Sequence, residues 1–417
     1  MQTTVTVAIF VLTYVLIAVR RLRLLPIGRP AGALLGATLM VVCGAITPAE
    51  SFRAIDGDTL LLLFAMMLLT AELAQTGFFE WASARTLARY RTPLALLTAI
   101  SLFAAGASAF FVNDTICLFM TPIVVGACRR ARLPMGPYLV MLATSANLGS
   151  AATLVGNPQN MLIGSLSQLP FAAYLVASLP AVLLALGLHI LLARRLYAKE
   201  LAPHPAWTAE THAAASTPRG LGPIAIVFAG VVVAFFAGAH LGYAALTGAT
   251  VLMLVRFRAP DETFRRVDWT VLVFFAALFI VTRALAQTGV VEDLWRASAA
   301  HLRLDDPGGV TAFTALMALG SNVVSNVPMV LLTGPYLPEL GDPALGYVLL
   351  GFVTTIAGNL TLVGSVANII VAEGAREHHT LAFVEYLRLG LPSTLIALAV
   401  GVVTLVWWAP VALAWFA

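Results

Sequence analysis

Charged residues are scarce in this chain, and lysine is almost absent. Of the 417 residues, 11% are charged and 60% are hydrophobic, and Lys199 is the single lysine among 24 basic residues. The mean hydropathy is +0.92. One water-soluble core cannot contain so much apolar sequence. The composition predicts a polytopic membrane protein that lies in a lipid bilayer. We expect no nucleic-acid partner, because the arginines lie in short loops between apolar segments.

Cysteines and common catalytic motifs are also few or missing. The spacing of the three cysteines indicates neither a disulfide framework nor a zinc site; they are Cys43, Cys117 and Cys128. The apolar segments contain no HExxH motif and no paired acids, and the chain has no GxxxxGK[ST] phosphate loop. We therefore expect neither an enzyme nor an ATP-driven pump, and no cofactor. Energy would come from an ion gradient or from a separate subunit.

Apolar segments long enough to cross about 30 Å of hydrocarbon occur ten times. We predict an all-α fold with membrane helices near residues 3–19, 31–48, 59–77, 135–165, 171–193, 222–239, 242–256, 269–289, 344–374 and 390–413. Two apolar regions are left over, 92–128 and 309–338. The second would form two arms of roughly 20 Å each, which is too short for two crossings. We predict that each region is a re-entrant hairpin with a polar tip near the midplane.

The arginines favour one orientation in the membrane. Most basic residues fall on the cytoplasmic side if both termini lie outside, as the positive-inside rule requires. The first cytoplasmic cluster consists of Arg20, Arg21, Arg23 and Arg29. This layout predicts an integral protein of a bacterial inner membrane.

One stretch of eight residues recurs 208 positions later. Residues 153–160 read TLVGNPQN, and residues 361–368 read TLVGSVAN. Polar, helix-breaking sequence in a membrane segment is tolerated only where it is buried in protein or lines a polar cavity. A proline kink is the simpler interpretation of Gly156-Asn157-Pro158, but Gly364 recurs without a following proline. Matching breaks in two halves of a chain are typical of a transporter's binding site.

A second repeat indicates how the two halves are related. Residues 55–77 align without gaps to 267–289, and nine of the 23 positions are identical. In the layout above the first copy runs inward and the second outward, which predicts two inverted-topology repeats with discontinuous helices at the midplane. Each repeat would have five transmembrane helices and one re-entrant hairpin. The predicted units are 1–193 (hairpin 92–128, broken helix 135–165), a cytoplasmic linker at 194–220, and 221–417 (hairpin 309–338, broken helix 344–374).

The hairpin tips carry a family resemblance. Asn113-Asp114-Thr115, followed by Leu118, Thr121 and Pro122, is similar to the first-hairpin motif of the arsenite permease branch of the ion transporter superfamily. Asn326-Val327-Pro328 resembles the matching second-hairpin motif. The superfamily also contains divalent anion:sodium symporters, citrate carriers and some sodium/proton antiporters. The resemblance implies a homodimer in which a domain of hairpins and broken helices moves against a scaffold. Dicarboxylate carriers of this group usually have Ser-Asn-Thr at both tips, and this chain does not.

The predicted tips and breaks offer suitable ligands for a small solute and a cation. Half-helix N-termini attract anions, whereas broken-helix carbonyls and Asn, Ser and Thr oxygens coordinate cations. We expect solute contacts at Asn113, Thr115, Ser325, Asn326, Asn157 and Ser365. We expect ion coupling, to sodium or protons, at Asp114, Asn113, Gly156, Asn326 and Gly364. We expect support from Thr153, Asn160, Pro328, Thr361 and Asn368. Asp114 is the only acid in a predicted tip, and ionisable residues at membrane depth are usually functional.

Two functions remain open. The first is secondary transport of a small oxyanion or uncharged oxyacid such as arsenite, coupled to sodium or protons, with alternating access. The second is sodium/proton antiport without any other solute. No basic residue lies at a tip or break, which favours a neutral or singly charged solute. A simpler interpretation of Asn113, Asp114 and Thr115 makes them only the N-cap of the second hairpin arm.

Overall fold

The computed structural model describes residues 2–18, 28–79, 81–82, 85, 92–202, 221–256 and 260–416. These residues form helices and connecting turns, and no strand occurs among them, so the predicted all-helical class is confirmed. Arg20, Arg21 and Arg23, and residues 203–220 of the predicted linker, lie outside the described residues.

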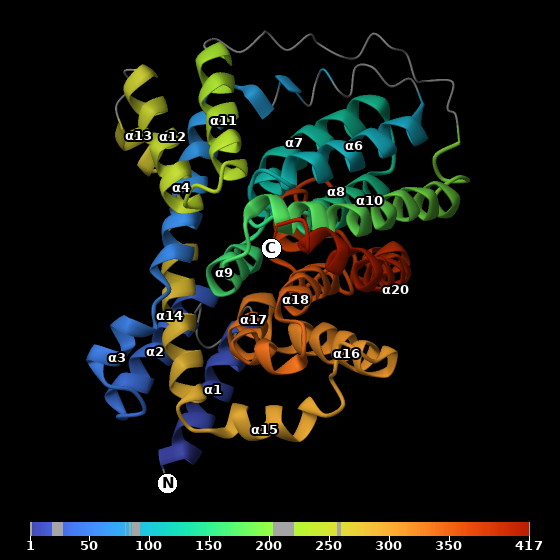
Figure 1. Ribbon diagram of the computed structural model, residues 1–417. Helices are drawn as coiled ribbons and strands as arrows, with labels where there is room; N and C mark the ends of the chain where they lie inside the picture. The colour runs from blue at the N-terminus through green and yellow to red at the C-terminus, as the bar shows by residue number, and fades with distance from the viewer. Residues whose placement is uncertain are drawn as a thin grey trace.

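The helices form two groups that lie side by side (Figure 1). Group A, on the left in Figure 1, comprises α1 (Gln2–Ala18), α2 (Arg29–Val42), α3 (Pro48–Ala54), α4 (Gly57–Ala74), α11 (Leu221–Phe236), α12 (Leu241–Arg256), α13 (Pro260–Phe264) and α14 (Trp269–Ala286). Within group A, α14 packs on α1 and α2, and α4 packs on α12, which in turn contacts α11. Helices from the first part of the chain therefore pair with helices from the second.

Group B contains the longest helices and all the interrupted ones. It comprises α6 (Pro93–Ser108), α7 (Asn113–Ala131), α8 (Met135–Ser150), α9 (Pro158–Ser167), α10 (Phe171–Leu196), α16 (Pro307–Val324), α17 (Asn326–Thr333), the 3-10 helix η2 (Gly334–Leu340), α18 (Pro343–Ala357), α19 (Val366–Gly374) and α20 (Phe383–Leu413). The most extensive packing joins α10 to α20, again across the two halves. Helix α15 (Val290–Ala299) connects group A to group B.

Five helices of the described residues are long and apolar enough to cross a membrane, namely α4, α10, α14, α16 and α20. Six shorter apolar helices accompany them. The predicted hairpin arms of about 20 Å were wrong for the second hairpin. Helix α16 has 18 residues, which is roughly 27 Å of helix, whereas α17 has only eight. The arms are unequal because η2 takes over from α17 at Gly334.

Several helices of group B begin with the same local chemistry. A polar residue precedes a proline, and its side-chain oxygen accepts a hydrogen bond from a backbone N–H in the first turn, which caps the helix. The capping residues and helices are Thr92 for α6, Asn157 for α9, Asp306 for α16 and Asp342 for α18. The sequence thus fixes where each of these helices starts.

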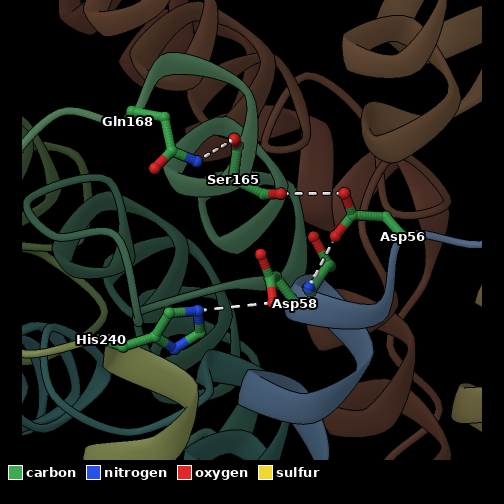
Figure 2. Close-up of polar contacts among 6 residues, drawn as sticks. Asp56, Asp58, Ser165, Gln168 and His240 are labelled. Atoms are coloured by element: carbon green, nitrogen blue, oxygen red, sulfur yellow. Dashed lines mark hydrogen bonds and ion pairs between the residues drawn. The ribbon is translucent and has the colours of Figure 1, made fainter.

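A small polar cluster joins the two groups near the start of α4 (Figure 2). Asp56 caps α4 by accepting a 2.7 Å bond from the N–H of Thr59, and it also accepts a 2.8 Å bond from the hydroxyl of Ser165 in α9. Asp58 pairs with His240, which precedes α12, at 3.4 Å. The contact of Asp56 with Ser165 connects group A to group B, whereas the contact of Asp58 with His240 stays within group A.

Candidate functional site

Two helix pairs and two interrupted helices of group B meet in one region. Helix α7 starts at Asn113, and α16 is joined to α17 by Ser325 alone. Residues 151–157 separate α8 from α9, and residues 358–365 separate α18 from α19. The first five residues of each segment that repeats in the sequence, 153–157 and 361–365, therefore lie in non-helical connections inside the helical core.

Both connections are closed by equivalent side-chain hydrogen bonds. The Asn160 amide donates to the carbonyls of Ser150 (3.2 Å) and Thr153 (2.9 Å). The Asn368 amide donates to the carbonyls of Gly358 (2.9 Å) and Thr361 (3.1 Å). Each residue of the second set stands 208 positions after its counterpart. These bonds satisfy backbone carbonyls that the breaks expose, which a buried segment requires.

The two connections also contact each other reciprocally. Asn157 donates to the hydroxyl of Thr355 at 3.2 Å, and the hydroxyl of Ser365 donates to Asn147 at 3.2 Å. Ser365 stands 208 positions after Asn157, and Thr355 stands 208 positions after Asn147. Each pair is thus the image of the other when the two copies are exchanged. The two copies of the repeated segment thus contact each other's helices in the same way.

Asn147 is the centre of a buried amide network. Its side chain accepts from Asn113 (2.7 Å) and Ser365, and it donates to Asn359 (2.7 Å) and Asn368 (3.1 Å). Asn147 is 1% exposed. Through α8, this network joins the tip of the first hairpin to the second break and the start of α19. Asn147 and Asn359 were not among the predicted site residues, although an asparagine inside an apolar helix is a usable signal.

A cavity of about 260 Å³ lies between the two groups. Group B contributes both hairpin tips and the second break, and group A contributes residues of α1, α2 and α14. The polar residues of group B that line the cavity are Asn113, Asp114, Gln159, Ser321, Asn322, Ser325, Asn326 and Ser365. Asp114 and Arg29 are the charged residues of the described lining.

The cavity gathers part of the predicted site. The predicted residues that line it are Asn113, Asp114, Ser325, Asn326, Pro328, Gly364 and Ser365. The predicted residues outside its lining are Thr115, Gly156, Asn157, Thr153, Asn160, Thr361 and Asn368.

Three expected contacts with solute or ion are thus placed elsewhere, for identifiable reasons. Thr115 follows Asn113 by two helical positions and so points roughly 200° away around α7. The carbonyl of Gly156 accepts the N–H of Asn113 at 3.0 Å. Asn157 is fully buried, and its side chain caps α9 and bonds to Ser150 and Thr355.

The interpretation of Asn113 as a simple helix cap was wrong. Val112 is the N-cap of α7, and no side chain caps that helix. The Asn113 amide donates to Asn147 instead, and its Oδ1 is buried without a hydrogen-bond partner among the described residues. The same holds for Oδ1 of Asn322. Two unpartnered amide oxygens therefore belong to residues that line the cavity.

Ser325 holds the second tip in a strained conformation. Its φ is +73°, and its ψ is 160°. This region of backbone space strongly favours glycine, and non-glycine residues in it cluster at functional sites. One strained residue suffices to reverse the chain between α16 and α17.

Arg29 was expected only as a cytoplasmic topology signal, but it lines the cavity. It begins α2, and it lines the cavity together with Asp114. The predicted site residues all come from the hairpin tips and the breaks of group B. Arg29 belongs to group A and was therefore not among them.

Comparison with known proteins identifies the class. The citrate transporter family, CitMHS, matches residues 14–347. The chain belongs to this family. The predicted membership of the ion transporter superfamily is confirmed, and the protein is an integral membrane transporter, not an enzyme.

Individual relatives cover nearly the whole chain. It is 32% identical to the silicon efflux transporter LSI3 of Oryza sativa subsp. japonica, over 91% of this chain and 92% of the relative. It is 28% identical to a putative transporter arsB of Dictyostelium discoideum, over 91% and 87%. The crystal structure of the Alcanivorax borkumensis YdaH transporter superposes with a TM-score of 0.58 at 16% identity, covering 98% of both chains. This last likeness concerns the fold alone.

Proposed function

We propose that this protein is an ion-coupled secondary transporter of a small oxyanion or uncharged oxyacid, and that the cavity between groups A and B is its solute site. The observation that carries the proposal is the convergence of both hairpin tips and the second break on one cavity. Names of relatives add support, since one is a silicon efflux transporter and another a putative arsB transporter. Silicic and arsenous acids are small, uncharged oxyacids at neutral pH.

The lining suits such a solute. Amides and hydroxyls both donate and accept hydrogen bonds, so they can pair with the OH groups of an oxyacid in a site sheltered from bulk water. Asn113, Ser325, Asn326 and Ser365 are the residues we assign to solute contact. Asn157 and Thr115 are assigned to the support of the site, together with Thr153, Asn160 and Asn368.

A coupling cation has two candidate positions. Asp114 is the acid of the described lining and would take a proton or sodium. Near the second break, a Cβ placed on Gly364 would lie 2.8 Å from the carbonyl O of Gly358, 2.9 Å from Oδ1 of Asn322 and 3.2 Å from the hydroxyl of Thr361. These oxygens converge on Gly364, and oxygens of a broken helix are typical sodium ligands in transporters.

Alternating access would come from movement of group B against group A. Helix α4 contacts α9, and α14 contacts α17, but the contacts expected from exchanging the two repeats, α14 with α19 and α4 with α7, are not among the extensive ones. We infer that the structure represents one of two states related by that exchange. Inverted repeats, a homodimer, two external termini and a bacterial inner membrane are part of this proposal.

Sodium/proton antiport is the second candidate, because Asp114 alone could exchange the two cations. Current measurements with liposomes on a solid-supported membrane separate the candidates. Arsenite, silicate, phosphate, sulfate, succinate and citrate are applied with and without sodium and across a pH step. Current evoked by one solute supports the leading proposal. Current evoked only by sodium or pH steps, with silence toward every solute, refutes it in favour of antiport.

A further inference from the structure

A buried histidine of group B lies outside the lining of the cavity and connects three helices. His189 of α10 is 2% exposed, and its two ring nitrogens contact two other helices. Nε2 lies 3.0 Å from the hydroxyl of Thr144 in α8, and Nδ1 lies 2.5 Å from the hydroxyl of Ser393 in α20. One side chain therefore joins α10 and α20 to α8, the helix that ends at the first break.

The hydroxyl of Thr144 determines which ring nitrogen carries the proton. That hydroxyl donates its single hydrogen to the carbonyl of Val140 at 2.7 Å, so it accepts from His189. Nε2 of His189 is then the protonated nitrogen, and Nδ1 accepts from the hydroxyl of Ser393. Both partners are uncharged, and a charged ring would be costly to bury without a charged partner. The neutral Nε2–H form satisfies both nitrogens of the ring.

Thr144 stands three residues before Asn147, the centre of the amide network. Residues three apart lie on nearly the same side of a helix, so a bond at Thr144 fixes how α8 is rotated at Asn147. Asn359 contacts both positions, because its amide donates to the carbonyl of Thr144 at 3.0 Å and its Oδ1 accepts from Asn147 at 2.7 Å. Asn147 in turn accepts from Asn113, which lines the cavity. Hydrogen bonds thus connect His189 to the first hairpin tip.

Helix α8 is also bound to the hairpin, by a separate contact. The hydroxyls of Ser145 in α8 and Ser101 in α6 lie 2.7 Å apart. That bond holds α8 against the first arm of the hairpin. The bond of His189 instead holds α8 against α10 and α20, which form the most extensive helix pair of the chain. His189 therefore relates the hairpin tip to the main frame of group B.

We propose that His189 is a positioning residue for the solute site, and that its bond to Thr144 holds α8 at the rotation that presents Asn147 to Asn113. The bond to Ser393 orients the ring, which the surrounding packing also does, so it matters less to the solute. The inference rests on the function proposed above. It places a determinant of solute affinity outside the cavity, in a helix that contributes no residue to the lining.

Two substitutions of His189 separate its two bonds. The amide of Asn stands where Nδ1 stands and can accept from Ser393, whereas the longer Gln places its NH2 group near Nε2 and can donate to Thr144. Each variant loses one bond, so we expect similar falls in melting temperature. In arsenite-evoked currents, the KM of His189→Asn should rise by about three- to ten-fold, the loss of about one hydrogen bond, and that of His189→Gln should stay within about two-fold. The kcat should change little in either.

Substitutions of the two partners provide matched tests. Thr144→Val removes the hydroxyl and keeps the shape, so it should raise KM as His189→Asn does. The combination of these two substitutions should raise KM no further, because both break the same bond. Ser393→Ala should behave like His189→Gln. Thr70→Val is the control, since the hydroxyl of Thr70 is buried but bonds only within α4, to the carbonyl of Met66.

Amide hydrogen exchange measures the position of the tip without any solute. The N–H of Asn113 donates to the carbonyl of Gly156 at 3.0 Å, and this bond protects it from exchange. Residues 111–116 should exchange faster in His189→Asn and Thr144→Val than in the wild type. His189→Gln and Ser393→Ala should keep exchange rates close to those of the wild type.

Equal rises of KM in His189→Asn and His189→Gln would overturn the positioning role, and so would additive effects of His189→Asn and Thr144→Val. Unchanged KM and exchange in folded Thr144→Val would overturn it too, and this variant decides if His189→Asn fails to fold. Wild-type protein that is silent toward arsenite and every other solute would refute the proposed function. The exchange rates would then still decide the role of His189.

Discussion

The amide of Asn113 donates a 2.7 Å hydrogen bond to Asn147, and this bond connects the first hairpin tip to the helix that breaks beside it. Asn147 has three further side-chain bonds, to Asn359, Asn368 and Ser365. Asn113 and Asn147 thus have different roles. Asn113 lines the cavity, whereas Asn147 lies behind it and positions the residues that do.

We expect Asn147→Ala to lower both stability and transport. The substitution leaves four buried polar groups without their partner, and each such group costs on the order of 1–3 kcal/mol. Asn113→Ala should abolish transport with a smaller loss of stability, because it frees one partner. Melting temperatures of the two variants in detergent measure the loss of stability, and solute-evoked currents measure the loss of transport. Equal melting temperatures for Asn147→Ala and wild type would contradict the positioning role.

Gly156→Ala should be strongly destabilising. A Cβ there would overlap the carbonyl O of Ser150 and lie 2.8 Å from that of Ser108, and both are backbone atoms that cannot rotate away. Gly106→Ala in α6 is the matched control, since a Cβ at Gly106 meets nothing within 4 Å. Expression and melting temperature of the two variants give the comparison. A Gly156→Ala protein as stable as Gly106→Ala would show that the first break packs differently.

Gly364→Ala should weaken the dependence of transport on sodium. Its methyl group would crowd the oxygens of Gly358, Asn322 and Thr361, which we assign to cation binding, and displace them. Solute-evoked current is measured as sodium is varied at constant pH. Gly106→Ala again serves as the control and should keep the wild-type response. An unchanged sodium dependence in folded Gly364→Ala would place the cation elsewhere.

Asp114→Asn should remove the coupling to the driving ion, because the neutral amide can neither exchange a proton nor balance the charge of a bound sodium ion. Transport down a solute gradient should persist, whereas accumulation driven by sodium or a pH step should be lost. Uptake by liposomes with and without each ion gradient distinguishes transport down a solute gradient from accumulation driven by an ion. Ion dependence identical to that of wild type would exclude Asp114 as the coupling residue.

The contact between Asp56 and Ser165 should open during each transport cycle (Figure 2). Cysteines at these two positions, in a protein whose exposed Cys43 is replaced by serine, should form a cross-link that stops transport until it is reduced. Cysteines at Asp58 and His240 are the control, because both residues belong to group A and should remain close throughout. Full activity of the oxidised Asp56→Cys/Ser165→Cys protein would mean that groups A and B do not separate here.

Local chemistry explains which parts of the fold could be predicted. The helical class follows from composition, and the helix starts follow from polar residues before prolines such as Pro93 and Pro307. The breaks were visible because the sequence that makes them is duplicated and polar. The unequal arms of the second hairpin were not visible, since the change from α17 to the 3-10 helix at Gly334 depends on packing and not on hydropathy.

The site could be predicted only in part, because the rest of it depends on tertiary packing. Asn157 and Ser365 are equivalent in sequence, yet only Ser365 lines the cavity, because the cavity lies nearer the second break. Asn147 lies within α8, before the first break, so its four bonds could not be inferred from spacing. Arg29 was counted among cytoplasmic charges, and a charge count does not tell which arginine lies at a cavity.

A structure of the protein with a bound solute tests the central claim most directly. The solute would be the one that evokes current in liposomes, and arsenite is favourable because arsenic can be located by its anomalous scattering. The account predicts one solute molecule in the cavity, between Asn113 and Ser365 and within hydrogen-bond reach of Asn326. Solute bound outside this cavity, in a protein that transports it, would contradict the assignment of the site.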